Sequence, residues 1–183
     1  MGVWYAHRLL TTFIMSELPE GWPKTEAARP FFPEGWLRGK GWPSFERAVS
    51  GMVKKATSSS WRRIVDPAVP RGFGILGGSG HRDAPLHPRE FAAELALKVF
   101  SNGADCEIVA GLYADTVAGA IGNATELEFA GCEWGDEDAE RLAAVLPQCT
   151  SLAHLDLGDN DIADEFVTRL WAAALPSLDL IYF

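Results

Sequence analysis

A pattern that occurs twice at a spacing of 28 residues, and begins a third time, constrains the fold of this chain more than any other feature. The two copies share five positions: Leu127, Phe129, Cys132, Trp134 and Asp136, then Leu155, Leu157, Asn160, Ile162 and Asp164. A third copy starts with Leu178, Ile181 and Phe183. A repeat of this length predicts one small structural unit per copy, each stacked on its neighbour.

Each copy begins with a segment that predicts a short strand. Leu127-Glu128-Phe129 and Leu155-Asp156-Leu157 alternate apolar and acidic residues, which is typical of a strand with one buried face. Cys132 and Asn160 follow three residues later. We expect a buried side chain at this position to bond the backbone where it leaves the strand.

A helix is predicted after each strand. Asp136 and Asp164 precede helical runs of apolar residues and suit an N-cap or a first turn. Pro147 and Pro176 follow those runs and are expected to end them, because proline cannot continue a helix.

A strand and a helix within 26 to 28 residues resemble the long, ribonuclease-inhibitor type of leucine-rich repeat. The resemblance covers residues 124–183 and implies a short βα solenoid. The alternative is two unrelated βα units in an ordinary α/β domain. Two repeats and a fragment are fewer than the three or so that stabilise a solenoid, so we expect this tail to depend on the preceding chain or on a partner.

The repeat tail is strongly acidic. Residues 124–183 hold thirteen Asp and Glu against two Arg, a net charge of −11, whereas the rest of the chain carries +2. The polar residues of the two strands are expected to line the concave face on which repeat proteins usually bind: Glu126, Glu128, His154 and Asp156. Such a face disfavours nucleic acid and favours a basic patch on a protein partner. The alternative for acids on the helices is simple solubility.

Composition predicts a cytoplasmic protein without a cofactor or metal. No apolar run approaches the 18 residues of a membrane span, and the start of the chain lacks the features of a secretory signal. Cys106, Cys132 and Cys149 are odd in number and form no C-x-x-C pair, so the sequence indicates neither a disulfide framework nor a zinc site.

Three further regions precede the tail. Residues 1–70 predict a partial α/β region, with strands at 11–15 and 61–66 and a helix at 43–55 whose N-cap is Ser44. Residues 71–87 predict a glycine-rich linker, and residues 88–123 a helical cap of two helices, the second capped by Asp105. Few residues precede the first strand, which favours a fragment of a longer protein unless the later chain supplies its neighbours.

Two loop motifs carry weaker alternatives. The segment 19–43 repeats Pro-Glu-Gly-Trp, and its tryptophans are expected to pack on the core, with an aromatic binding platform as the alternative. Residues 72–77 spell G-x-G-x-x-G but lack the flanking strand and helix of a dinucleotide site, which favours a linker. His81 and His87 have no third ligand at metal-binding spacing.

The stretch 38–71 is basic, with eight Lys and Arg against Glu46 and Asp66. Its local charge of +6 is opposite to that of the tail. Self-association of this stretch with the acidic tail, within one chain or between two, is therefore a further hypothesis, and phosphate contact is the alternative.

Residues 4–113 also resemble a family of uncharacterised proteins from unicellular algae and related protists. The resemblance rests on Gly41-Trp42-Pro43-Ser44-Phe45-Glu46, close to the family's RGWxxFE phrase, and on the segment 100–105. It implies no established activity. The spacing of Trp42 and Glu46 is also similar to a helix start in Toll/interleukin-receptor domains, which implies NAD cleavage by Glu46 as the enzymatic alternative. A structural role for Glu46 in the first helical turn is the simpler expectation.

The sequence therefore predicts an α/β chain that ends in a short leucine-rich repeat tail. Because it contains no complete catalytic site, the function it favours is noncatalytic protein binding through the acidic face.

Overall fold

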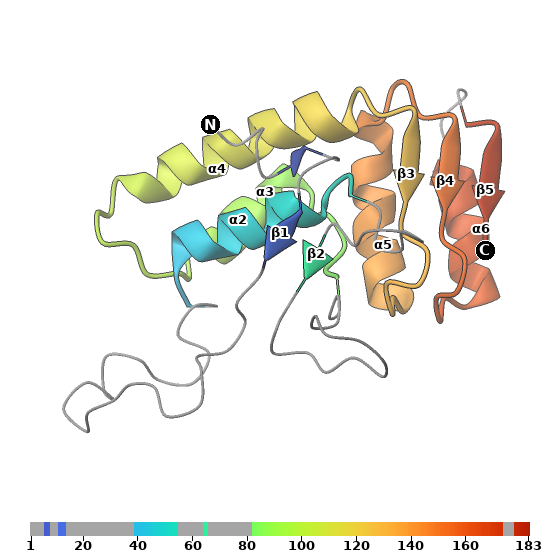
Figure 1. Ribbon diagram of the computed structural model, residues 1–183, viewed down its shortest axis with the longest axis horizontal. Coiled ribbons are helices and arrows are strands. Elements are labelled where there is room, and N and C mark those ends of the chain that lie inside the picture. Colours follow the sequence, from blue (N-terminus) through green and yellow to red (C-terminus); the bar gives the residue numbers. More distant parts are fainter. Residues whose placement is uncertain (1–5, 8–10, 14–38, 55–63, 66–81, 174–177) are drawn as a thin grey trace.

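The computed structural model has a mixed α/β architecture in which helices accompany parallel strands (Figure 1). It describes the chain except for residues 1–5, 8–10, 14–38, 55–63, 66–81 and 174–177. The predicted α/β class is confirmed. None of the helices in the described part of the chain has the length and apolar character that a bilayer crossing requires.

A three-stranded parallel sheet forms the C-terminal part of the molecule. Its strands are β3 (Glu126–Glu128), β4 (His154–Asp156) and β5 (Leu180–Tyr182), in that spatial order. The register aligns Leu127 with Leu155 and Leu155 with Ile181. The 28-residue displacement of the sequence thus becomes a lateral step of one strand, as the repeat predicts.

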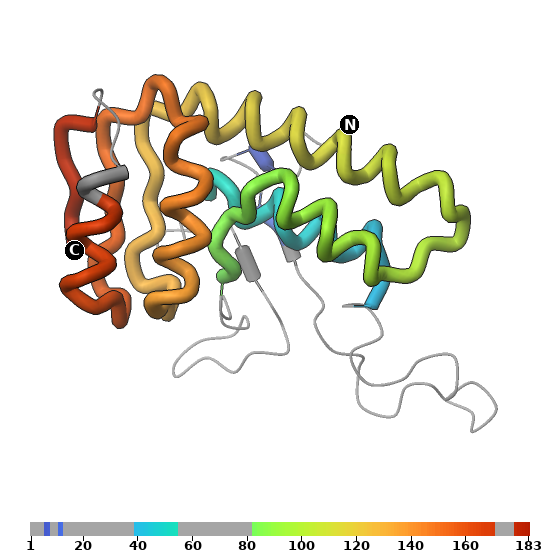
Figure 2. Tube along the Cα trace, turned by 180° about the vertical axis from the view of Figure 1, so that it is seen from behind, coloured from blue at the N-terminus to red at the C-terminus, as the bar shows by residue number. Residues whose placement is uncertain are grey.

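Two helices cover one face of this sheet. They are α5 (Asp136–Val145) and α6 (Asp164–Ala173), which lie side by side; α6 is behind β4 and β5 in Figure 1 and in front of them in Figure 2. Leu127, Leu155 and Ile181 point toward these helices and are buried. The predicted first-turn positions of Asp136 and Asp164 are confirmed.

Helix α5 ends differently from the prediction. The helix runs to Val145 and continues into the 3-10 turn η3 (Leu146–Gln148), so Pro147 lies inside this tighter turn. Proline fits there because the first residues of a turn need no backbone N–H donor. The chain then reaches Leu152, which is buried beside the sheet, before β4 begins.

Two antiparallel helices lead into the first repeat. They are α3 (Pro88–Leu95) and α4 (Asp105–Thr116), and α4 continues as the π-helical turn η2 (Val117–Ile121) into the loop before β3. The Phe91 and Tyr113 rings stack with centroids 3.7 Å apart and join the two helices. Figure 1 shows α4 running along one edge of the molecule up to β3.

The predicted cap of α4 is wrong by one residue. Ala104 occupies the N-cap position and Asp105 is the first helical residue. The side chain of Asn102 instead accepts a hydrogen bond from the Ala104 backbone N–H, 3.3 Å away. Asp105 is engaged elsewhere, because its Oδ2 accepts a hydrogen bond from Trp42 Nε1 at 3.1 Å.

The N-terminal part contains two short strands and one helix. Strand β1 (Thr12–Phe13) pairs in parallel with β2 (Ile64–Val65), so the later chain supplies the neighbour that the first strand needs. Helix α2 (Gly41–Gly51) packs against α4. It begins earlier than predicted, because Lys40 forms a parallel bridge with Val99 and precedes the first helical turn.

The earlier start of α2 corrects two predictions. Ser44 is not the N-cap but lies inside the helix, where its hydroxyl donates to the Lys40 carbonyl at 2.8 Å. Glu46 lies in the second turn, and the first turn of α2 holds no acidic residue. The helix dipole therefore does not account for Glu46 as expected.

Candidate functional site

The four residues predicted to line a binding face lie together on the open face of the three-stranded sheet. Their neighbours along β3 and β4, Leu127 and Leu155, point to the helices, so the alternation of a strand directs Glu126, Glu128, His154 and Asp156 to the other side. Glu126 and His154 are exposed, and Glu128 and Asp156 are partly exposed. Their role in binding stays a prediction.

The residues form two rows across the strands. One row pairs Glu126 with His154, whose Nδ1 is 4.0 Å from Glu126 Oε1. The other row pairs Glu128 with Asp156. Like charges directly opposite each other on neighbouring strands are destabilising, so the second row concentrates negative charge at a local energetic cost.

Backbone contacts hold the second row in place. Asp156 Oδ1 accepts a hydrogen bond from the Gly158 backbone N–H at 3.0 Å. The backbone carbonyl of Glu128 accepts one from Arg82 Nη1 at 3.1 Å. These bonds restrain the strand ends, so the two carboxylates are presented by an ordered backbone.

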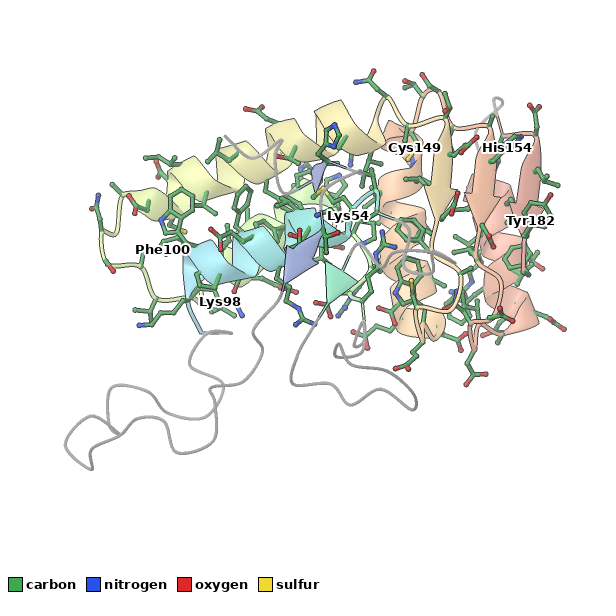
Figure 3. All side chains as sticks on the ribbon, in the orientation of Figure 1. Lys54, Lys98, Phe100, Cys149, His154 and Tyr182 are labelled. Carbon is green, nitrogen blue, oxygen red and sulfur yellow. The ribbon has the colours of Figure 1, made fainter. Side chains whose placement is uncertain are left out.

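Both rows continue onto β5, which sequence reasoning missed. Leu180 lies beside His154, and Tyr182 lies beside Asp156. Both side chains are exposed, Tyr182 by 55 %, and Figure 3 shows Tyr182 on the strand next to His154. The signal was present, because Leu180 and Tyr182 flank the apolar Ile181 just as Glu126 and Glu128 flank Leu127.

Asn160 joins the two repeats behind this face. Its Oδ1 accepts hydrogen bonds from the backbone N–H groups of Cys132 and Trp134, at 3.0 and 3.1 Å. Its Nδ2 donates to the carbonyl groups of Phe129 and Leu157, at 2.9 and 2.8 Å. The predicted bonding of this side chain to the backbone is confirmed, and it reaches both copies of the repeat.

Arg82 joins the tail to the N-terminal part. Its guanidinium is buried, donates to the carbonyl groups of Gly51 and Glu128, and lies 4.6 Å from the Phe129 ring centroid. The indole N–H of Trp134 in turn donates to the Arg82 carbonyl. Burial lowers the pKa of Arg82 to about 10. The sequence held no signal for this residue, which falls at the end of the predicted linker.

The cysteines of the tail are free and buried. Burial raises the pKa of the Cys132 thiol, and it raises that of Cys149 to about 11. The thiolate is the reactive form of cysteine, so a raised pKa disfavours nucleophilic chemistry at either position.

Part of the basic stretch 38–71 is described. Arg47 Nε lies 2.7 Å from Asp83 Oδ2, and Lys54 is buried with its Nζ donating to Thr12 Oγ1 at 2.5 Å. Both therefore engage groups outside the acidic face. Arg38, Lys55 and the three later arginines lie outside the described residues, so self-association of this stretch with the tail stays a prediction.

Most of the loop motifs also lie outside the described residues. This holds for the first two Pro-Glu-Gly-Trp tryptophans, for the G-x-G-x-x-G segment and for His81. Trp42 is described, and it packs edge-on against Phe45 with ring centroids 6.1 Å apart. His87 accepts a hydrogen bond from the Arg89 backbone N–H as the N-cap of α3. Within the described ranges, no group of three potential ligand side chains could hold a metal ion.

Comparison with protein-family models, with curated proteins and with solved structures finds no match. The functional interpretation therefore rests on the geometry of the sheet face.

Proposed function

We propose that this chain is a noncatalytic protein-binding module with a short leucine-rich repeat tail, whose acidic sheet face binds a basic partner. The observation that carries the proposal is the row of Glu128 and Asp156 on adjacent strands of an open sheet face. Two adjacent carboxylates repel each other, and a cation placed between them would relieve this repulsion.

Two features support the leucine-rich repeat interpretation. The strands stack in parallel at the 28-residue displacement, with a helix behind each of the first two. Asn160 bonds the backbone of both repeats at the point where each leaves its strand. This use of one asparagine per turn is what a repeat with a buried polar position requires, because backbone groups at the bend have no ladder partner.

Charge reversal tests the proposal. We expect Glu128→Lys with Asp156→Lys to weaken binding of a fluorescein-labelled octapeptide with four arginines about tenfold or more at low salt. Both variant side chains again carry like charges, so the repulsion across the strands is similar and the fold is expected to persist. Fluorescence anisotropy measures the binding, and urea denaturation checks the fold.

A second double variant controls for net charge. Glu140→Lys with Glu165→Lys changes the net charge equally, and both residues are exposed on α5 and α6, on the helical side. We expect it to weaken peptide binding less than about threefold, because exposed charges are largely screened by salt. An equal loss in both double variants would show that the peptide responds to net charge and would contradict a binding face.

A further inference from the structure

The sheet face changes from acidic to apolar across its three strands. Glu126 and Glu128 lie on β3, His154 and Asp156 on β4, and Leu180 and Tyr182 on β5. The seven exposed large apolar side chains of the described residues fall into two groups: Leu180, Tyr182 and Phe183, and Trp42, Leu97, Val99 and Ile108. The second group belongs to the other end of the molecule, where Figure 3 labels Lys98 and Phe100. Apolar surface is therefore concentrated beside the carboxylates.

We propose that this face takes an extended peptide segment in which a basic residue and an apolar residue are two positions apart. The inference rests on the proposed function and specifies the partner. The basic side chain lies over Glu128 and Asp156, and the apolar side chain lies over Tyr182 and Leu180. A basic residue alone would leave the apolar end of the face in water.

The spacing follows from the geometry of strands. Neighbouring strands lie about 4.8 Å apart, so a point midway between Glu128 and Asp156 is about 7 Å from Tyr182 across the sheet. In an extended peptide, residues i and i+2 point to the same side and are also about 7 Å apart. Adjacent residues point to opposite sides, so they cannot place both side chains on the face together.

The chemistry at each end favours arginine as the cation and an aliphatic or aromatic apolar residue. A guanidinium presents a planar fork of donors that two neighbouring carboxylates can share, and it stacks on aromatic rings such as that of Tyr182. A second copy of the chain is a poorer occupant, because its own tail carries a net charge of −11.

Two peptides of identical composition and charge test the spacing. One is Gly-Leu-Ser-Arg-Ser-Leu-Gly, in which both leucines are two positions from the arginine, whatever the direction of binding. The other is Gly-Ser-Leu-Arg-Leu-Ser-Gly, in which both are adjacent to it. NMR titration of the labelled full chain measures the affinity and follows the amide signals of β4 and β5.

We expect the first peptide to bind about five- to tenfold more tightly, because the contact of one leucine with Tyr182 and Leu180 removes apolar surface from water. Tyr182→Ser is expected to abolish most of this preference. Leu97→Ser is the matched control, since Leu97 is also exposed and apolar but lies in the segment between α3 and α4. It is expected to leave the preference unchanged.

The outcomes separate this inference from the proposed function. Equal affinity for the two peptides, with binding still lost in the Glu128→Lys and Asp156→Lys double variant, would overturn the spacing and leave the acidic binding face intact. A preference that survives Tyr182→Ser would also overturn the inference. If neither peptide shifts signals of β3, β4 or β5, both the inference and the proposed function fail.

Discussion

Asn160 is the side chain on which the junction between the two repeats depends most. It bonds two N–H groups and two carbonyl groups at the bend after β3 and β4, and a third carbonyl, that of Gly158, lies 3.3 Å from Nδ2. These backbone groups face the interior of the bend, where water reaches them poorly. A buried polar group without a partner costs about 1 to 3 kcal/mol, so their loss is not easily compensated.

We predict that Asn160→Ala lowers the free energy of unfolding by about 3 kcal/mol, measured by urea denaturation. Asn160→Asp is expected to be destabilising as well, because it keeps the acceptor but turns a second acceptor toward three carbonyl groups. Asn123→Ala is the control, since the exposed Asn123 makes one side-chain bond, to the Gly119 carbonyl at 3.0 Å. A loss in Asn160→Ala no larger than that in Asn123→Ala would contradict the role of this junction.

Lys54 is a second residue whose environment has a measurable consequence. Burial, and then the charge of Arg82, lower its pKa from 10.5 to about 8. Between these two pH values the unfolded chain binds more protons at this residue than the folded chain, so its contribution makes the free energy of unfolding rise with pH. Figure 3 places Lys54 at the centre of the molecule, beside β1.

We predict that the free energy of unfolding of the wild type, relative to that of Lys54→Met, rises between pH 8 and 10.5 by an amount on the order of 1 to 2 kcal/mol after allowance for screening. The comparison with the variant is needed because Cys149 acts in the opposite direction: its raised pKa makes stability fall as pH rises from 9 to about 11. Urea denaturation at a series of pH values measures both curves. Parallel curves would exclude the predicted shift.

At the scale of elements, the start of α2 depends on a close approach of two segments. Gly41 bonds the Val99 carbonyl through its N–H, at 3.2 Å, and the ring of Phe100 occupies the space where a Cβ at position 41 would lie. A larger residue would therefore displace the ring or the first turn of the helix. Gly111, in the exposed part of α4, has open space around it.

We predict opposite signs for the same substitution in these two helices. Gly41→Ala should lower the free energy of unfolding by about 1 to 3 kcal/mol, because it overpacks the contact with Phe100. Gly111→Ala should raise it by about 0.5 to 1 kcal/mol, because alanine loses less conformational entropy than glycine in a helix. Thermal denaturation followed by circular dichroism measures both. Stabilisation by Gly41→Ala would show that the ring is free to move.

At the scale of the whole molecule, one hydrophobic core runs from the N-terminal part into the repeats. Its buried residues include Phe45 of α2, Tyr113 of α4 and Leu155 of β4. Arg82 bridges the same two parts through the Gly51 and Glu128 carbonyl groups. A continuous core with a bridging side chain favours a single cooperative unfolding transition.

We predict that α4 and the strands β3 and β4 lose protection from hydrogen exchange together as urea is added to the wild type. Arg82→Ala should lower the free energy of unfolding by about 3 to 4 kcal/mol, because it leaves a cavity and two carbonyl groups without their donor. It should also separate the two transitions, with the tail opening first. Arg89→Ala, at an exposed position of α3, should do neither. Separate transitions already in the wild type would contradict a shared core.

The sequence by itself determined the elements of the tail and the polarity of its open face. Leu127 and Leu155 alternate with acids at a period of two, and the following helices bury residues at helical spacing; both patterns reflect local geometry that needs no knowledge of distant contacts. The position of Asn160 was also predictable, because its place after the strand repeats that of Cys132.

The tertiary structure alone decided how these elements meet. The pairing of β1 with β2, the bridge between Lys40 and Val99 that starts α2 early, and the burial of Arg82 all join residues far apart in the chain. Such contacts depend on which surfaces come together, and no periodicity in the sequence records that. For the same reason, only the register of β4 with β5 placed Tyr182 beside Asp156 and made the acidic face apolar at one end.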